Sequence, residues 1–337
     1  MDDSEAQFVG RLCVLFDLGD PQSVAISPIP GNANRLWRLE VDGSNFVVKE
    51  FRYTIADRRW VSAIRKAAEF EFNVWETSRL FMAEPIRGKD GAILQTIIGS
   101  RGAPAVIRLH RWLDGTSVPK RVPTATAKAA GGLLSDIHKL GGGFANSDQG
   151  TLRWWRWDPA GTLLRLQQLG LFDAKAAANG HAALSDAGRL IAAGEATSGR
   201  WIFSHYDHKP ENTLSISNGL AILDWDESAL CHPRLEVAES ALHWAGIEGG
   251  DPSSAGFAGF IEGYRNRGGQ IGDLRPSDFA KWAASIVGWF DYLGRRALQE
   301  FDDNTEEAEA AAQEAVAVIA SLSIRMPEVQ KWSSWGG

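Results

Sequence analysis

The sequence of 337 residues is poor in cysteine and has no long apolar segment. Its two cysteines, Cys13 and Cys231, supply neither a disulfide framework nor the spacing of a metal site. No apolar run approaches the length that crosses a bilayer. The acidic segment 1–5 differs from a secretory signal. We therefore expect a cytoplasmic protein of a reducing compartment, with no membrane as a partner.

Basic residues are also outnumbered, with 35 lysines and arginines against 42 aspartates and glutamates. The resulting net charge of −7 argues against nucleic acid as the main partner. It is compatible with a cationic substrate, although a solvated acidic surface is the commoner cause of such a balance. Neither Gly-x-x-x-x-Gly-Lys-Ser/Thr nor Gly-x-Gly-x-x-Gly occurs, so we expect no P-loop nucleotide site.

Three polar residues in the second half of the chain stand in the spacing His-x-Asp-x-x-x-x-Asn: His205, Asp207 and Asn212. Asp224 follows twelve residues after Asn212, at the end of a short apolar run. Between them, 217–219 is a tight-hairpin signal, so the segment predicts strand, loop, strand, turn and strand. Such a hairpin returns Asp224 beside Asn212, where their oxygens can converge on magnesium. A proton-accepting carboxylate and oxygen ligands for magnesium are the parts that phosphoryl transfer needs.

Neighbouring side chains on this loop suggest further roles. His208, together with His205 and Asp207, raises the idea of a zinc site, but no third nitrogen or sulfur ligand has suitable spacing nearby. Lys209 either contacts the γ-phosphate or is a solvated loop cation, and the sequence does not decide between the two.

The segment resembles the catalytic segment of the aminoglycoside phosphotransferase and choline kinase superfamily, small-molecule relatives of protein kinases. The family pattern His-x-Asp-x-x-x-x-Asn and Ile-Asp-Trp-Asp/Glu matches 205–212 and 223–226, and 232–238 follows its Asp-Pro-x-x-Asp-Leu-Ala pattern with His and Glu for the aspartates. The resemblance implies an α+β, two-lobed protein-kinase-like fold. The expected lobes are a small mainly-β N-terminal lobe, 1–111, and a larger mainly-α C-terminal lobe, 112–337.

The resemblance also implies roles for the residues of this segment. Asp207 would be the catalytic base, and Asn212 and Asp224 would be the magnesium ligands. His205 would brace the loop in preference to moving a proton. Asp226 would be a further ligand or a support.

The N-terminal part resembles the nucleotide-binding lobe of the same family. Asp42-Gly43 between alternating runs predicts a hairpin, and Lys49 ends its second strand, where a kinase-like fold keeps its phosphate-pairing lysine. Asn34 matches the last position of the family's Gly-x-x-Asn turn, which lies over the phosphates. The lysine needs an acidic partner on the helix expected over 64–80. We favour Glu71, with Glu69 as the rival.

A strand and hinge like those that join the two lobes are expected at 105–115. Backbone groups around Arg111 to Leu113 would meet the adenine edge. The cofactor-binding residues that the resemblance implies are therefore Asn34, Lys49, Glu71, Arg111 and Leu113. The choice between ATP and GTP stays open.

The C-terminal part has mainly helical patterns. Helices are expected over 124–141, 160–195 in two pieces, 236–247, 253–267, 276–300 and 304–322, with a flexible joint at 141–143. Fourteen tryptophans are many for this length, and several fall in the basic aromatic segment 153–158. That segment either binds a bulky acceptor through ring stacking or only packs between helices.

The sequence thus predicts magnesium-dependent transfer of the γ-phosphate of ATP or GTP to a hydroxyl of a small molecule, such as an antibiotic or a nucleoside- or sugar-like compound. The alternatives are a non-catalytic nucleotide-binding sensor, a metabolic kinase of the choline, homoserine or sugar type, and a magnesium-dependent phosphohydrolase. A protein substrate is disfavoured because Asp-Trp-Asp replaces Asp-Phe-Gly and no activation segment fits before Glu236. The oligomeric state stays open.

Overall fold

The structure is a computed structural model that describes residues 3–30, 34–51, 57–152, 157–301 and 303–336. The chain forms two compact units. Met1–Val118 and Glu211–Ala229 make up the first, and Pro119–Pro210 and Leu230–Gly337 make up the second. The lobe boundary predicted after residue 111 stays a prediction.

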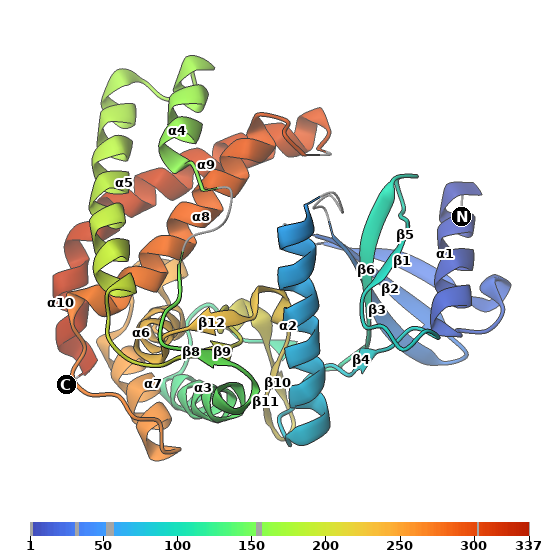
Figure 1. Cartoon of the computed structure of the whole chain (residues 1–337). Coiled ribbons are helices and arrows are strands. Elements are labelled where there is room, and N and C mark those ends of the chain that lie inside the picture. Colours follow the sequence, from blue (N-terminus) through green and yellow to red (C-terminus); the bar gives the residue numbers. More distant parts are fainter. Residues whose placement is uncertain (1–2, 31–33, 52–56, 153–156, 302, 337) are drawn as a thin grey trace. The chain divides into compact units, whose positions relative to one another are not determined.

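The first unit is built on an antiparallel sheet (Figure 1). Its strand order is β1-β2-β3-β6-β4, with β5 also paired to β6. The turn from β2 to β3 has Asp42 and Gly43 at φ values of 48° and 76°, the left-handed backbone that the predicted tight hairpin requires. The strands are β1 (Ala25–Ile29), β2 (Arg35–Val41), β3 (Ser44–Glu50), β4 (Pro85–Ile86), β5 (Gln95–Ile98) and β6 (Pro104–Arg111).

The two faces of this sheet differ in chemistry. Helix α1 (Asp3–Phe16) packs its apolar stripe, including Phe8 and Leu12, on the face that carries Val48 and Leu109. Because successive strand residues point to opposite faces, the intervening positions are turned away from α1. Helix α2 (Arg58–Thr77) lies on that other side of the sheet (Figure 1).

A second, three-stranded sheet completes the first unit, in the order β11-β10-β7. The predicted hairpin over the turn at 217–219 is present, with Thr213 paired to Ile222 and Ile216 to Gly219. Its elements are β7 (Thr116–Ser117), β10 (Thr213–Ile216), β11 (Gly219–Ile222) and the short 3₁₀ helix η3 (Trp225–Glu227).

The second unit is mainly helical, as the sequence predicts. A small sheet in the order β12-β9-β8 accompanies the helices. None of the helices in the described ranges is long and apolar enough to span a bilayer. The helices are α3 (Thr124–Phe144), α4 (Pro159–Gln168), α5 (Ala174–Glu195), α6 (Pro233–Trp244), α7 (Ser254–Asn266), α8 (Ala280–Ala297), α9 (Thr305–Arg325) and α10 (Val329–Ser333), and the strands are β8 (Asn146–Ser147), β9 (Trp201–Ser204) and β12 (Ala229–Cys231).

Two sequence-based expectations for this unit need correction or completion. The glycines at 141–143 are not a joint, because α3 runs through them to Phe144. Packing of α3 against β9 outweighs the low helix propensity of glycine. Several tryptophans, among them Trp201, Trp244 and Trp332, are core residues. Most of the segment 153–158 lies outside the described residues.

Helices α3 and α7 approach closely at two buried glycines. A Cβ atom on Gly263 would overlap the carbonyl oxygen of Lys128, and one on Gly131 would overlap that of Phe260. Backbone cannot move away as a flexible side chain can, so these positions exclude any larger residue.

We expect Gly263→Ala to lower the free energy of unfolding by about 1–3 kcal/mol, because the added methyl group forces the two helices apart. Urea unfolding measures the change. The matched control is Gly188→Ala in α5, where an added Cβ meets nothing within 4 Å. That change should stabilise by about 0.5–1 kcal/mol, since alanine is the better helix former. Equal effects of the two substitutions would contradict the close approach.

Candidate active site

Lys49 lies on the face of the first unit's sheet that is turned away from α1. Its Nζ atom donates to Asp224 Oδ1 at 2.6 Å and to Asp226 Oδ2 at 2.5 Å. Burial alone would lower the pKa of Lys49, but the two carboxylates outweigh it and raise the pKa above its usual value. The lysine is therefore a charged, fixed ammonium group at neutral pH.

The hairpin places Asn212 and Asp224 at its open end. The Leu223 N–H donates to the Asn212 carbonyl oxygen at 2.8 Å, which continues the pairing of β10 and β11 by one step. Asp224 follows directly, with a left-handed φ of 60°. Such a conformation is rare in non-glycine residues and is concentrated at functional sites. The structure thus brings the two predicted magnesium ligands to the same end of one hairpin.

Glu71, predicted as the partner of Lys49, has other partners. Its carboxylate forms an ion pair with Arg108 and accepts a hydrogen bond from His110 Nε2 at 3.0 Å. Among the described residues, no ion pair joins Glu71 to Lys49. The expected pairing is therefore corrected: Asp224 and Asp226 take the ammonium group, and an arginine from the neighbouring strand takes Glu71. Glu69 does not take the place of Glu71 as the partner of Lys49, since Lys49 forms an ion pair with neither glutamate.

His110 stays neutral in this cluster. Burial and the positive charges of Arg108 and Lys49 lower its pKa to about 3. Its contact with Glu71 is therefore a hydrogen bond from a neutral imidazole whose Nε2 carries the proton. Sequence analysis did not single out Arg108 or His110, although their spacing of two within a predicted strand shows that they share a face.

The hinge residues lie where β6 ends. The Arg111 N–H donates to the Glu84 carbonyl at 2.9 Å, and the Trp112 N–H donates to the Asn45 carbonyl at 2.8 Å. The Leu113 N–H has no hydrogen-bond partner among the residues that the structure describes. A backbone donor left open at this point is suited to the edge of a base.

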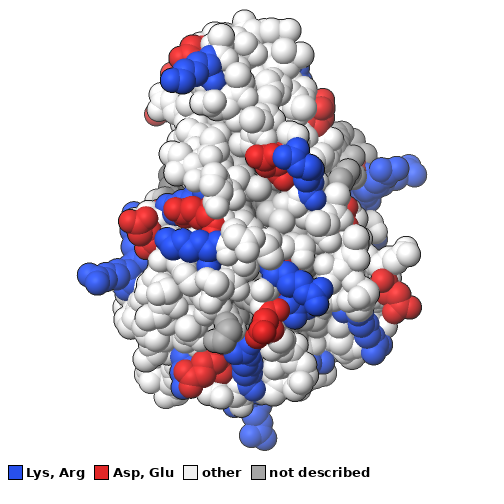
Figure 2. Space-filling view, turned by 90° about the vertical axis from the view of Figure 1, so that its left-hand side faces the viewer, with Lys and Arg blue, Asp and Glu red and all other residues white. Residues whose placement is uncertain are grey.

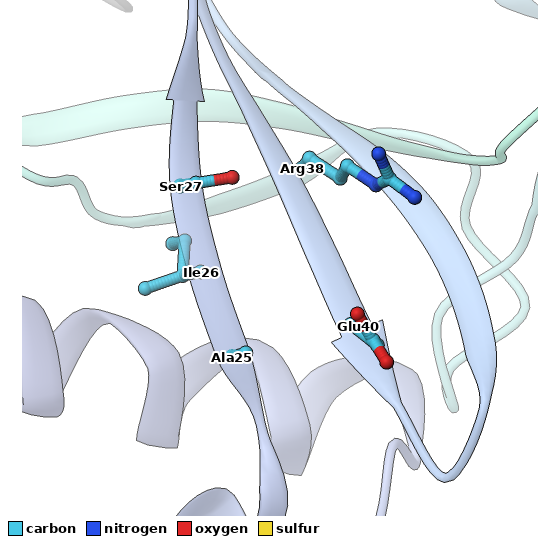
Figure 3. A pocket seen from close by; sticks show the side chains of 5 residues that line it. All are labelled: Ala25, Ile26, Ser27, Arg38 and Glu40. Carbon is cyan, nitrogen blue, oxygen red and sulfur yellow. The ribbon is translucent and has the colours of Figure 1, made fainter.

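A half-open pocket of about 230 Å³ lies on strands β1 and β2 (Figure 3). Arg38 stands in register with Val47, two residues before Lys49, so the pocket's Arg38 and Glu40 share the face of Lys49. The Arg38 guanidinium lies 4.5 Å from the Trp112 ring centre, which connects this face to the hinge. Ala25, Ile26, Ser27, Arg38 and Glu40 line the pocket.

Asn34 precedes β2, at the end of the turn expected over the phosphates. Its Oδ1 atom is buried and has no hydrogen-bond partner in the described part of the chain. A buried amide oxygen without a partner costs free energy, and a ligand donor or water would remove that cost. The other residues of the predicted turn lie outside the described residues.

Asp207 belongs to the second unit, on the loop after β9. Lys209 Nζ lies 2.9 Å from its Oδ2 atom, so the structure places this lysine against the carboxylate. Burial raises the pKa of Asp207, but the positive charges of Lys209, Lys281 and His243 outweigh it and hold the pKa well below its usual range. Asp207 is therefore ionised and able to accept a proton.

Glu236 supports this loop from α6. Its Oε1 atom accepts from the Tyr206 N–H at 2.8 Å, and its Oε2 atom contacts His138 Nε2 at 3.0 Å. Tyr206 has a left-handed φ of 69°, a conformation that this hydrogen bond holds in place. Burial disfavours the charged form of Glu236, yet His138 lowers its pKa to about 2. This glutamate sits in the segment that matches the family pattern at 232–238.

Lys281 is a buried cation that sequence analysis missed. It forms an ion pair with Glu239, and its Nζ atom lies 4.0 Å from the Tyr206 ring centre. Burial opposes its charge, but Glu239 outweighs burial and raises the pKa to about 12. The sequence signal that could have indicated this buried cation was a lysine on the apolar face of the helix predicted over 276–300.

The loop histidines have protein partners. His208 Nε2 lies 3.0 Å from the Ala130 carbonyl oxygen, and burial together with nearby His205 lowers the pKa of His208 to about 3. His205 Nδ1 accepts from the Asp207 N–H at 3.3 Å, which fits the bracing role expected of it. Within the described ranges, no group of three His, Cys, Asp or Glu side chains is arranged to hold a metal ion.

The pKa of His243 gives a pH-dependent prediction for the second unit. Burial opposes its charge, but Glu248 and Glu239 outweigh burial and raise the pKa to about 10. Because the folded-state pKa exceeds the unfolded value of about 6.5, the stabilisation is complete below that value and is lost as pH rises through about 10. The wild-type minus His243→Asn difference in free energy of unfolding should shrink over this range. The exposed His181→Asn is the control, and a difference that grows with pH would contradict the pairing.

Comparison with known proteins gives the class of this chain. Residues 25–269 match the model of the phosphotransferase enzyme family, and the chain belongs to this family. The resemblance to aminoglycoside phosphotransferases and choline kinases is thereby confirmed. The protein is therefore a phosphotransferase. No curated protein has significant sequence similarity to it.

Solved structures confirm the two-lobed, protein-kinase-like fold. Amicoumacin kinase hAmiN, in complex with AMP-PNP and Ca²⁺, is 13% identical, with a TM-score of 0.65 over 95% of this chain and 94% of that one. A microcompartment-associated aminopropanol kinase is 13% identical, with a TM-score of 0.66 over 96% and 97%. Spectinomycin phosphotransferase APH(9)-Ia, with ADP and spectinomycin, is 15% identical, with a TM-score of 0.59 over 94% and 97%.

Proposed function

We propose that this protein transfers the γ-phosphate of ATP or GTP, with Mg²⁺, to a hydroxyl group of a small molecule. The observation that carries the proposal is the contact of 2.6 Å between Lys49 and Asp224, residues 175 positions apart in the chain. The fold brings together the lysine that would bind phosphate and a carboxylate that would bind the metal ion. Family membership supports the same chemistry.

The nucleotide would bind to the first unit. The pocket of Arg38 and Glu40 lies on the same sheet as Lys49, and Leu113 follows two residues after strand β6 of that sheet, so this unit offers sites for a base, a ribose and phosphates. Lys49 would bind the α- and β-phosphates, as its charge and position allow. Asn34 Oδ1, buried and without a described partner, would bind a ligand donor or water beside them.

Asn212 and Asp224 fit Mg²⁺ because they offer an amide and a carboxylate oxygen at the same end of one hairpin. Magnesium takes few protein oxygens and completes its shell with phosphates and water. When bound, it would neutralise charge on the β- and γ-phosphates. Complexes of the structural relatives with AMP-PNP and Ca²⁺, or with ADP, support the use of a nucleotide and a divalent cation.

Asp207 would act as the base for the acceptor. The hydroxyl oxygen forms a bond to the γ-phosphorus, the bond from phosphorus to the β,γ-bridging oxygen breaks, and the hydroxyl proton passes to the Asp207 carboxylate. Lys209 and Lys281 keep that carboxylate ionised before the transfer. Catalysis would rest on positioning and on charge stabilisation, with no covalent enzyme intermediate.

The acceptor is proposed only as a class. Relatives of similar fold include kinases for amicoumacin and aminopropanol and a phosphotransferase for spectinomycin. Antibiotics, amino alcohols, and nucleoside- or sugar-like compounds therefore form the set to be tested.

A nucleic acid or membrane partner is not proposed. On the face drawn in Figure 2, basic and acidic side chains are interspersed without a broad field of one sign. A cytoplasmic location stays a prediction.

An assay with purified protein, Mg²⁺, and either ATP or GTP against this set of compounds tests the proposal. ADP or GDP formation that depends on the acceptor supports a kinase. Phosphate release without an acceptor would indicate a phosphohydrolase. Nucleotide-dependent stabilisation with no turnover on any acceptor would indicate a sensor. The phosphohydrolase is disfavoured because it does not need the lysine and hinge features that the first unit keeps.

A further inference from the structure

Arg108 is a buried cation in the middle of a strand. It lies on β6, directly opposite Lys49 on β3, so both side chains are on the same face of the sheet. Its side chain is only 1% exposed. A buried guanidinium is tolerated only where carboxylates pair with it, because removal from water is costly. The carboxylates that pair with Arg108 are therefore what stabilises its buried charge.

The first partner is Asp226, which Arg108 shares with Lys49. Arg108 contacts Asp226 Oδ1, and Lys49 lies 2.5 Å from Oδ2. One carboxylate thus connects the two cations, with one oxygen for each. The planar guanidinium is suited to this bridging, since its donors diverge in a fixed fork. The place of the Lys49 ammonium group then depends on Arg108.

The second partner is Glu71 on α2. Arg108 contacts its Oε2 atom, and His110 contacts its Oε1 atom at 3.0 Å. Both contacts come from β6, two residues apart. Helix α2 is therefore attached to β6 through Arg108 and His110, and not to β3 through Lys49.

The two aspartates of the cluster differ in how far they are exposed to solvent. Asp226 is 7% exposed and is paired with both Lys49 and Arg108, whereas Asp224 is 44% exposed and is paired with Lys49. If Asp224 turns to a metal ion, Lys49 keeps Asp226 as a partner. The side chains of Lys49, Arg108, Glu71, Asp224 and Asp226 sum to one negative charge, since His110 is neutral. A divalent cation is compatible with that balance.

We propose that Arg108 is a positioning residue of the nucleotide site. Its guanidinium fixes helix α2 through Glu71 and, by taking one oxygen of Asp226, sets the position of Lys49. The effect on nucleotide binding rests on the proposed function. The pairing of Arg108 with Glu71 does not, so the two can fail separately.

The pairing is tested by double-variant cycles in urea unfolding. We expect Glu71→Gln and Arg108→Gln to be coupled, so that the double variant has a midpoint close to that of Arg108→Gln alone. Glu71→Gln and Lys49→Gln, whose side chains do not pair directly, should be coupled less strongly. Coupling of Glu71 to Lys49 and not to Arg108 would overturn the proposal. Should Arg108→Gln fail to fold, Arg108→Lys serves in its place, because it keeps the charge and loses the fork.

The positioning role is tested by binding of Mg·AMP-PNP, measured calorimetrically, and by steady-state kinetics. Arg108→Lys should raise the Kd and the KM for nucleotide by about tenfold, with a smaller change in kcat, because Lys49 is displaced from the phosphates. Glu71→Gln should change them less, since its amide oxygen still accepts from Arg108. A folded Arg108→Lys variant with unchanged Kd and KM would refute the role. No binding to the wild-type protein would instead defeat the proposed function.

Arg87→Gln is the matched control for both experiments. Arg87 also contacts α2, with its guanidinium 3.6 Å from the Phe72 ring centre, but it is exposed and has no part in the Lys49 cluster. We expect less than a twofold change in Kd and KM for this variant. A loss as large as that of Arg108→Lys would show that removing any arginine in contact with α2 has the same effect, and it would overturn the proposal.

Discussion

Replacing Asp207 with asparagine is expected to lower kcat by a factor of about 10²–10⁴ and to leave the Kd for the magnesium nucleotide within about twofold. The carboxylate is the group that accepts the hydroxyl proton, and an amide cannot do so at neutral pH. The residues proposed to bind nucleotide, such as Lys49 and Asp224, belong to the other compact unit. Acceptor-dependent ADP formation and calorimetric nucleotide binding measure the two quantities.

Asp186→Asn is the control for this change. Asp186 is a partly exposed aspartate of the same unit, on α5, and pairs with Arg189 one turn away. Loss of such a surface pair should leave kcat unchanged and stability within about 1 kcal/mol. Equal loss of turnover and nucleotide affinity in Asp207→Asn, with the fold intact, would count against Asp207 as the base.

The second large effect is expected for Asp224→Asn. Removing this carboxylate takes away a proposed magnesium ligand, so the Kd for magnesium nucleotide should rise by about tenfold or more and kcat should fall with it. The fold should survive, because Lys49 keeps Asp226 and because asparagine tolerates a left-handed backbone. Mg²⁺ titration at fixed nucleotide separates weakened metal binding from misfolding.

The chain offers a close control in Asp17→Asn. Asp17 also has a left-handed φ, 57°, and pairs with a lysine, Lys89, at 2.7 Å in the same unit. It lies outside the Lys49 cluster, so nucleotide affinity should not change. If Asp224→Asn behaved like Asp17→Asn, Asp224 would not be a metal ligand.

Much of the fold could be predicted from local patterns. The hairpin at Asp42-Gly43 and the hairpin that returns Asp224 to Asn212 follow from turn chemistry, which acts over a few residues. Helix positions in the second unit followed from apolar periodicity. The glycines at 141–143 were misjudged, because helix packing outweighs the propensity of single residues.

The sequence predicted which residues lie in the candidate site, but it predicted only some of the ion pairs between them. Lys49 and Asp224 were both expected in the site and are in contact, and the roles given to them stay predictions. Glu71 was expected to pair with Lys49, yet it pairs with Arg108. Lys281 and Arg108 were missed because a charged residue in an apolar helix or strand shows only that it is unusual, and its partners are known only once the chain is folded.

The sequence by itself determined the class of chemistry, since the spacing of His205, Asp207, Asn212 and Asp224 and the strand that ends at Lys49 are local features of the chain. Only the tertiary structure decided which cation meets which carboxylate. Arg108 stands beside Lys49 because of the register between β3 and β6, and Glu71 reaches it because α2 lies on that face. Ion pairs form between the charges that folding brings nearest, and that proximity depends on strand register and helix packing across long stretches of sequence.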